Sequence, residues 1–167
     1  MKIKLSNYFK KKTFPDYGRK FNSYKKALNF SENIGEYFDF RLTKFEGPDQ
    51  VKLIDRFYLA SFLPTLLKSK KPVVVDIGGG ANPVYSYIKK ATNIATKCFV
   101  LDTNKLVKIL KKKIPKKFKS DVKYIFSLNE INFKNVEIVY FNSSIQYLEN
   151  YEKIIKNVIK FKPKYIL

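Results

Sequence analysis

The sequence contains no histidine and no tryptophan, and Cys98 is its single cysteine in 167 residues. Without histidine, neither a Ser–His nor a Cys–His nucleophile pair can form, which disfavours most hydrolase mechanisms. The common zinc ligand sets are missing as well, so metal chemistry would depend on carboxylates alone, and we expect no metal site. One cysteine cannot form an internal disulfide, and Cys98 lies in an apolar segment that is typical of a protein core.

Long apolar runs are also absent. No stretch approaches the roughly 18 apolar residues that a membrane span needs, and residues 1–8 lack the apolar block of a signal peptide. We therefore expect a cytoplasmic protein without a membrane span. The hydrophobic content of 45% is still sufficient for the core of one domain.

Arginine is scarce among the basic residues. The formal net charge is +20, but only three of the 34 Lys and Arg residues are arginines. Clustered basic residues suit nucleic acids, whereas these lysines are spread over nearly every segment, as in the compositional bias of an AT-rich genome. We expect a solvated basic surface, with a polyanion partner as the less favoured alternative. The densest basic run, residues 111–119, is predicted to follow a helix as a loop.

Two regions of the chain differ in pattern. Residues 1–48 carry turn formers between short aromatic stretches, and we predict a cap or lid with one helix at residues 23–30. From Asp49 to Phe62, apolar residues recur at helical spacing, which predicts a helix that has Asp49 as its N-cap and packs on a sheet. Residues 49–167 are predicted to form a cofactor-binding domain.

Strands and helices alternate after Pro72. Val73–Ile77 is typical of a strand buried on both faces, and Asn82-Pro83 is predicted to provide the N-cap and first residue of the next helix. Further strands are predicted at residues 98–101, 122–126, 138–141 and 165–167, and helices at residues 84–90, 104–112 and 149–160. This alternation predicts an α/β fold with a mostly parallel sheet and helices on both faces.

Three consecutive glycines follow the first predicted strand, in the run Asp76-Ile77-Gly78-Gly79-Gly80-Ala81-Asn82. Open parallel sheets bind ligands at the carboxyl ends of their strands, where glycines permit sharp turns and close backbone approach. A second acid, Asp102, ends the next predicted strand, and a carboxylate at that place can accept both hydroxyl hydrogens of a ribose. The pattern therefore favours a cofactor that contains adenosine.

The spacing of the glycines separates the candidate cofactors. A dinucleotide loop needs its third glycine where this chain has Pro83, so NAD(P) or another nucleotide ranks second. The methyltransferase pattern acid-x-Gly-x-Gly-x-Gly fits Asp76, Gly78 and Gly80, and departs only at Asn82, a residue type that tolerates left-handed backbone angles. We therefore favour S-adenosylmethionine. A third hypothesis is a cofactor-binding relic or basic nucleic-acid-binding module without catalysis.

The same segments resemble a family of bacterial class I S-adenosylmethionine-dependent methyltransferases that are often encoded among surface-polysaccharide genes. The resemblance rests on Asp76–Gly80 followed by Tyr85, on Val100–Asp102 and, most specifically, on the run Asn142-Ser143-Ser144-Ile145-Gln146-Tyr147-Leu148-Glu149. Tyr17 and the segment Ser23-Tyr24-Lys25-Lys26-Ala27 also look like the start of that family, although Tyr24 stands where a tryptophan is more usual.

The resemblance implies a Rossmann-like fold with the strand order 3-2-1-4-5. It also implies a cofactor site at the strand ends, formed by Asp76, Gly78, Gly79, Gly80, Asn82, Asp102, Leu128, Asn129, Asn142 and Ser143. Within it, the first acid and the glycines would face the methionine part of the cofactor, the second acid the ribose, residues 128–129 the adenine, and residues 142–143 the methyl group. Gln146 and Tyr147 would touch the cofactor or the acceptor. No catalytic residue is assigned, because orientation can supply much of the rate of methyl transfer. The implied acceptor is a small molecule or glycan, such as a surface-polysaccharide sugar or precursor.

The end of the sequence gives a further expectation. Class I methyltransferases normally add two strands after the fifth, whereas this sequence stops at Leu167, inside a predicted apolar strand. We therefore expect a fragment of a longer gene product, or a partner that completes the sheet. Self-association through the open sheet edge is one such arrangement.

Overall fold

The computed structural model describes residues 22–23, 25–26, 44–56, 62–63, 65–132, 135–142, 144–145, 148 and 150–167. The chain divides into two units, residues 1–38 and 39–167. In the first unit, Ser23 Oγ accepts a hydrogen bond from the backbone N–H of Lys26 at 3.3 Å. Most of the helix predicted at residues 23–30 lies outside the described residues, and the division at residue 48 stays a prediction.

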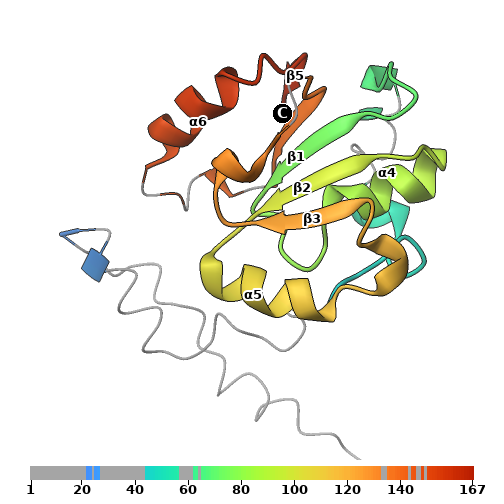
Figure 1. Cartoon of the computed structure of the whole chain (residues 1–167), viewed down its shortest axis with the longest axis horizontal. Coiled ribbons are helices and arrows are strands. Elements are labelled where there is room, and N and C mark those ends of the chain that lie inside the picture. Colours follow the sequence, from blue (N-terminus) through green and yellow to red (C-terminus); the bar gives the residue numbers. More distant parts are fainter. Residues whose placement is uncertain are drawn as a thin grey trace, which may run out of the picture. The chain divides into compact units, whose positions relative to one another are not determined.

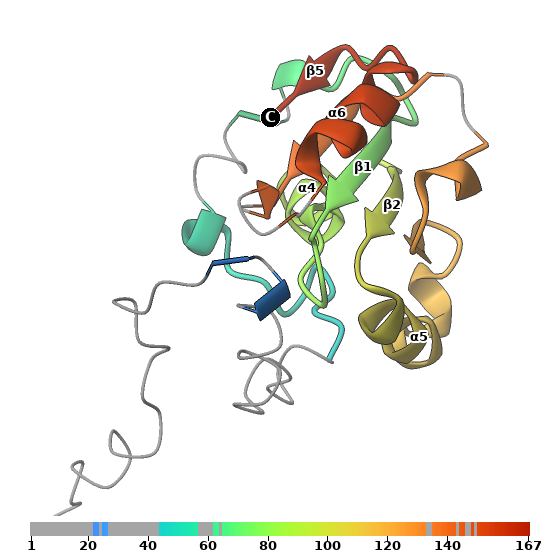
Figure 2. The same cartoon turned by 90° about the vertical axis from the view of Figure 1, so that its left-hand side faces the viewer.

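The described part of the second unit contains a parallel sheet of five strands (Figure 1). The strands are β1 (Val73–Ile77), β2 (Lys97–Leu101), β3 (Val122–Ile125), β4 (Ile138–Phe141) and β5 (Tyr165–Ile166). Their order is β3-β2-β1-β4-β5, and the arrows of β1 and β2 point to the same end of the sheet (Figure 2). The predicted α/β Rossmann-like fold with strand order 3-2-1-4-5 is therefore confirmed.

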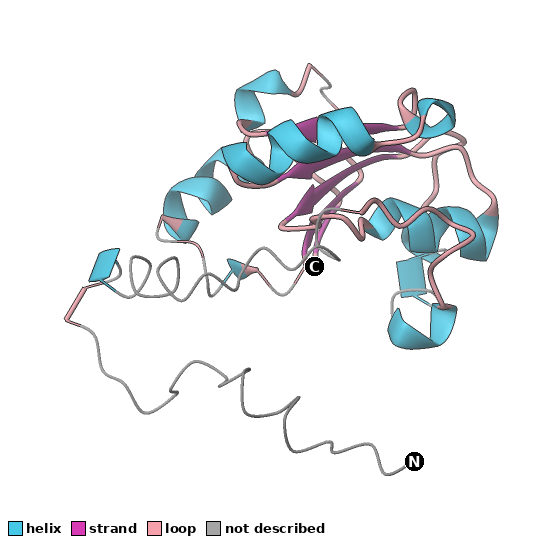
Figure 3. Ribbon diagram, turned by 90° about the horizontal axis from the view of Figure 1, so that it is seen from below, coloured by secondary structure: helices cyan, strands magenta, loops and turns pink. Residues whose placement is uncertain are grey.

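Strand β1 is central because its apolar side chains can be buried on both faces of the sheet. All five of its residues are buried. Val74 lies in the core cluster formed with α4 (Val84–Thr92) and α5 (Asn104–Lys113), whereas Val75 lies in the cluster covered by α6 (Tyr151–Ile159). Helices thus pack on both sides of the sheet (Figure 3), which fixes β1 and the loop after it.

The start of α4 differs from the prediction. Pro83 is the N-cap residue and makes no side-chain capping bond, so the prediction of Asn82 as the N-cap is wrong. The Asn82 side chain turns away, and its Nδ2 donates to the hydroxyl of Tyr87 at 3.1 Å. The carboxylate of Asp76 replaces it, because Oδ2 accepts the first free N–H of the helix, from Val84, at 2.7 Å. A side chain from β1 therefore caps the helix that follows β1.

The segment before the sheet packs along α4. Its contacts with α4 and the loop before it include a bond from the N–H of Glu46 to the carbonyl of Ala81 (2.8 Å). The helix predicted to begin at Asp49 is wrong at its start, because residues 48–50 form a turn and the first helical piece is a 3₁₀ helix, Leu53–Arg56. Gln50 Oε1 accepts the N–H of Gly47 at 2.6 Å, so a side chain stabilises this turn instead of a helix. Residues 57–61 lie outside the described residues.

The boundaries of β1 and β4 match the predicted ones, and those of the other strands and helices after Pro72 differ by one or two residues. Two unpredicted 3₁₀ helices follow α5 and β3, at Lys116–Phe118 and Leu128–Glu130, so the basic run predicted as a loop is partly helical. Within the described residues, no helix is long and apolar enough to cross a membrane. Strand β5 lies at the sheet edge with Ile166 46% exposed, and association through this edge stays a prediction.

Candidate functional site

The loop after β1 makes a sharp turn that two of its glycines permit. Gly78 has φ +77° and Gly80 has φ +53°, both in the left-handed region that side chains disfavour. A Cβ on Gly78 would also lie 2.3 Å from the Cβ of Ser144, so the segment after β4 packs directly on this turn. At Gly80 the nearest atoms to such a Cβ are 3.9 Å away, which is ordinary contact. The protein itself fills the space at Gly78, whereas at Gly80 an added Cβ would make only ordinary contacts, with Asp102 and Leu106.

Asp76 is a buried carboxylate with one oxygen engaged and one free. It is 0% exposed, and Oδ2 accepts the Val84 N–H, but Oδ1 is buried without a hydrogen-bond partner. Burial raises the pKa of Asp76 to about 7, and the Val84 hydrogen bond and the positive charge of Arg56 oppose this shift. A buried acceptor without a donor is costly, so Oδ1 is suited to a donor or cation supplied by a ligand.

Asp102, at the end of β2, lies beside the glycine loop. Its Oδ2 accepts the N–H of Gly80 at 3.2 Å, and its Oδ1 accepts the N–H of Thr103 at 2.7 Å. Burial raises the pKa of Asp102, and these two backbone hydrogen bonds counteract the shift. A carboxylate has about four acceptor positions, so each oxygen can still accept a further hydrogen bond. The structure thus brings together the two acids that the sequence placed at neighbouring strand ends.

The loop is also held by a residue that the sequence analysis did not select. Tyr124, on β3, donates its hydroxyl hydrogen to the carbonyl of Gly80 at 2.9 Å. Because Gly80 also donates to Asp102, its peptide groups are fixed from two strands. An alternating strand pattern marks Tyr124 as core, and only the folded sheet shows that its hydroxyl reaches the loop.

The predicted adenine residues follow β3 and lie in the 3₁₀ helix Leu128–Glu130. Leu128 is 8% exposed and belongs to the core cluster under the sheet, whereas Asn129 is exposed. The backbone N–H of Asn129 donates to Ser127 Oγ at 3.2 Å, as part of a capping box with Glu130. These contacts fix the backbone of the turn, so a ligand on this side would meet backbone groups and the exposed side chain of Asn129.

The predicted residues after β4 are only partly described. The N–H of Asn142 donates to the carbonyl of Ile77 at 3.0 Å, which places Asn142 beside the end of β1. Ser144, its near neighbour, donates from Oγ to the same carbonyl at 2.6 Å. Ser143, Gln146 and Tyr147 lie outside the described residues, so their predicted roles stay predictions.

Arg56 is a charged residue near this site that the sequence analysis missed. Its guanidinium carbon lies 5.0 Å from the centre of the Tyr87 ring, and Nη1 is buried without a hydrogen-bond partner. Its positive charge favours the ionised forms of Asp76 and Tyr140, whose pKa values it lowers against the effect of burial. One signal was present in the sequence, since Arg56 is one of only three arginines in a lysine-rich chain.

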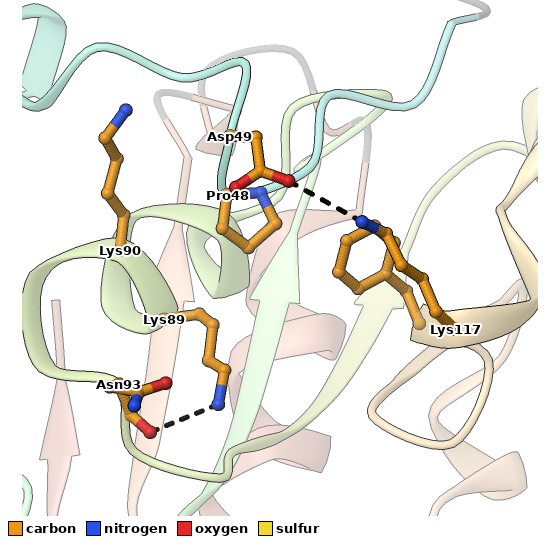
Figure 4. Close-up of a pocket in the computed structure, with 7 residues that line it drawn as sticks. Pro48, Asp49, Lys89, Lys90, Asn93 and Lys117 are labelled. Atoms are coloured by element: carbon orange, nitrogen blue, oxygen red, sulfur yellow. Dashed lines mark hydrogen bonds and ion pairs between the residues drawn. The ribbon is translucent and has the colours of Figure 1, made fainter.

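A separate depression of about 520 Å³ lies at the other end of α4 from the glycine loop (Figure 4). It is lined by Pro48, Asp49, Lys89, Lys90, Asn93, Lys117 and Phe118. Its ammonium groups are already engaged: Lys89 Nζ donates to the carbonyl of Asn93 (3.1 Å), Lys90 Nζ donates to a backbone carbonyl (2.6 Å), and Lys117 lies 3.6 Å from Asp49. The strand ends are therefore the stronger candidate site.

Comparisons with known proteins give likenesses only among solved structures. No family model and no curated protein matches the sequence. The YcgJ protein of Bacillus subtilis is 16% identical, over 64% of this chain and 46% of that chain, with a TM-score of 0.49. A protein of Methanococcus maripaludis, described provisionally as an S-adenosyl-L-methionine-dependent methyltransferase, is 12% identical over 86% of this chain and 61% of that chain, with a TM-score of 0.48. The chain thus spans about half the length of the first and less than two thirds of the second.

Proposed function

We propose that this chain binds S-adenosylmethionine at the carboxyl ends of β1, β2 and β4 and belongs to a class I methyltransferase. One observation supports this proposal most strongly. The buried Asp76, the open turn at Gly80 and the carboxylate of Asp102 lie together where the strand order reverses around β1. Open α/β sheets bind their ligands at such a position.

The polar groups fit the parts of this cofactor. The ribose has two adjacent hydroxyls, which the remaining acceptor positions of Asp102 can receive. The amino-acid end carries an ammonium group, which the unpartnered Oδ1 of Asp76 can accept. The turn at Gly80 leaves space for close approach, because the nearest atoms to an added Cβ are 3.9 Å away. Both carboxylates beside the loop, those of Asp76 and Asp102, would therefore accept hydrogen bonds from the cofactor.

The same geometry disfavours a dinucleotide. In NAD-binding folds the pyrophosphate lies at the N-terminus of the helix after the first strand, where free N–H groups attract an anion. Here the N–H of Val84 at that helix start is already bonded to Asp76 Oδ2 at 2.7 Å. A pyrophosphate at this place would meet a carboxylate in place of a free donor, so the local charge opposes it.

For catalysis, these residues would mainly bind and orient. When bound, S-adenosylmethionine supplies a methyl group that is already activated on a sulfonium. Asp102 and the backbone at Gly80 would hold the nucleoside, and Asn142 would lie beside the end of β1. Alignment of two reactants can account for a large part of a rate enhancement, so a dedicated base is not required.

The acceptor and the compartment form a finer part of the proposal. The family resemblance favours a sugar or a precursor of a surface polysaccharide as the acceptor, and the sequence favours the cytoplasm. The segment that would face the acceptor includes Gln146 and Tyr147, which lie outside the described residues, so the acceptor class rests on the resemblance alone. The cofactor is therefore the part of the proposal that can be tested first.

Thermal unfolding with added ligands tests the choice of cofactor. S-adenosylhomocysteine, the demethylated product, should raise the unfolding temperature in a concentration-dependent way, because a ligand that binds only the folded state stabilises it. NAD at the same concentrations should leave the temperature unchanged. Stabilisation by NAD and not by S-adenosylhomocysteine would overturn the proposal in favour of a dinucleotide enzyme.

A further inference from the structure

Several buried polar atoms near the glycine loop have no hydrogen-bond partner. Among the described residues, four buried side-chain polar atoms have no hydrogen-bond partner: Arg56 Nη1, Asp76 Oδ1, Asn82 Oδ1 and Glu137 Oε2. Three of them surround the junction of β1 and α4, and Tyr87 connects two of these residues, with its ring under Arg56 and its hydroxyl bonded to Asn82. Native proteins rarely leave such groups unpaired, so their clustering indicates a polar ligand.

The charges in this cluster are opposite but do not pair. The ion pairs among the described residues are Lys111–Glu130, Lys117–Asp49 and Lys164–Glu137, and none of them joins Arg56 to Asp76. The two groups still interact electrostatically, because the charge of Arg56 lowers the pKa of Asp76 against the effect of burial. A cation and an anion that lie in one site without forming an ion pair suit a ligand with both charges. The ligand's carboxylate would then bind the cation, and its ammonium group would bind the anion.

We propose that Arg56 binds the carboxylate of the amino-acid end of the cofactor, while Asp76 Oδ1 accepts a hydrogen bond from its ammonium group. This assignment rests on the proposed function and extends it to a residue that precedes the sheet. It accounts for Nη1 of Arg56 and Oδ1 of Asp76, which are otherwise buried without partners. Strand pairing places Tyr140 beside Asp76, and the side chain of Arg56 also hydrogen-bonds to Tyr140, so β4 borders the same group of residues.

The chemistry of arginine supports this role. A guanidinium presents a planar fork of donors that matches a carboxylate, and its weak hydration makes it easier to bury than an ammonium. The Tyr87 ring, 5.0 Å from the guanidinium carbon, can hold that plane in position by a cation–π contact. The chain has lysine at almost every other basic position, yet this half-buried position carries an arginine.

A comparison of ligands tests the assignment by binding alone. The probes are S-adenosylhomocysteine, its decarboxylated analogue, which keeps the ammonium group, and 5′-methylthioadenosine, which lacks both charged groups. Calorimetry of the unaltered chain should show that loss of the carboxylate weakens binding by at least about tenfold, as expected for a charged hydrogen bond. Equal affinity for the first two probes would overturn the assignment without any variant.

An Arg56→Met variant, which retains apolar contact with Tyr87, tests whether Arg56 is the group that binds the carboxylate. It should bind S-adenosylhomocysteine and the decarboxylated analogue equally, and 5′-methylthioadenosine as tightly as the unaltered chain does. Arg56→Lys should recover part of the preference for the carboxylate. If Arg56→Met keeps the full preference, Arg56 is a packing residue and the assignment is wrong. If the unaltered chain binds none of the three nucleosides, the proposed function itself fails, which is a separate result.

Discussion

Raising the pH from about 5 to about 8 should destabilise the ligand-free protein through one buried group, Asp76. Burial raises its pKa from the ordinary value of 3.8 to about 7. In this interval the folded state keeps a proton that the unfolded chain has already released. Because the folded state then binds more protons, its stability falls as the pH rises, from about pH 4 until the folded pKa is passed near pH 7.

The size of the effect follows from the shift. One pKa unit corresponds to about 1.4 kcal/mol, so the full shift is worth roughly 4 kcal/mol above pH 7. About 2.5 kcal/mol of this loss should occur between pH 5 and pH 8, since the unfolded carboxyl is already mostly ionised at pH 5. A domain is usually stable by only about 5 to 15 kcal/mol, so the change is large enough to measure.

The composition of the chain makes the measurement clean. There is no histidine, and no other type of side chain has its ordinary pKa between 5 and 8. Asp102 has a raised pKa as well and contributes in the same direction. Urea unfolding followed by far-ultraviolet circular dichroism gives the free energy of unfolding at both pH values, for the unaltered chain and for Asp76→Asn. The asparagine can still accept the Val84 N–H but carries no charge.

We expect the stability of the unaltered chain to fall between the two pH values and that of Asp76→Asn to fall much less, the remainder coming from Asp102. The reasoning is refuted if the unaltered chain is equally stable at both pH values. It is also refuted if Asp76→Asn keeps the full pH dependence, because the titrating group would then lie elsewhere.

Three further predictions concern the ligand. Gly80→Val should destabilise the fold by about 1–2 kcal/mol in unfolding assays and weaken S-adenosylhomocysteine binding in calorimetry, because φ is +53° there. Gly80→Asn should retain more of the stability and of the affinity, whereas equal binding by the valine variant would show that the loop is not part of the site. Asp102→Ala should weaken binding by at least about tenfold in calorimetry. As a control, Asp49→Asn, which changes an exposed acid at the other end of α4, should leave binding unchanged. A tight complex with the Asp102→Ala variant would show that Asp102 only stabilises the turn. At about pH 6, binding should release a proton from Asp76, so the calorimetric heat of binding should depend on the ionisation heat of the buffer. The same dependence in the Asp76→Asn variant would contradict the contact between Asp76 and the ammonium group.

The parallel α/β sheet was predictable because its signals are local, whereas its strand order was implied by the family resemblance. Val73–Ile77 is an uninterrupted apolar run, and each later strand is separated from it by a helical pattern, which leaves few topologies open. The glycines after it and the acid at the end of β2 also follow from local pattern. Since parallel strands end at the same edge of a sheet, these local features are sufficient to predict that Asp76 and Asp102 lie close together.

The missed features depend on contacts between distant segments. Asn82 has the right residue type and position for an N-cap, but the carboxylate of Asp76 reaches Val84 first, and only the fold shows which of two suitable acceptors is closer. Arg56 looks like an ordinary charged residue in a helical pattern. Its place in the site depends on the packing of its 3₁₀ helix against α4, where Tyr87 lies.

Nuclear magnetic resonance of a ¹⁵N-glycine-labelled chain tests the central claim most directly. The chain has six glycines, and three of them form the loop after β1. Carbonyl labelling of glycine identifies Gly79 and Gly80, because they alone follow another glycine. Addition of S-adenosylhomocysteine should shift the signals of Gly78, Gly79 and Gly80 and leave Gly47, which packs on Phe118, in place. Loop signals that stay unmoved at saturating ligand, or that move only with NAD, would contradict the account.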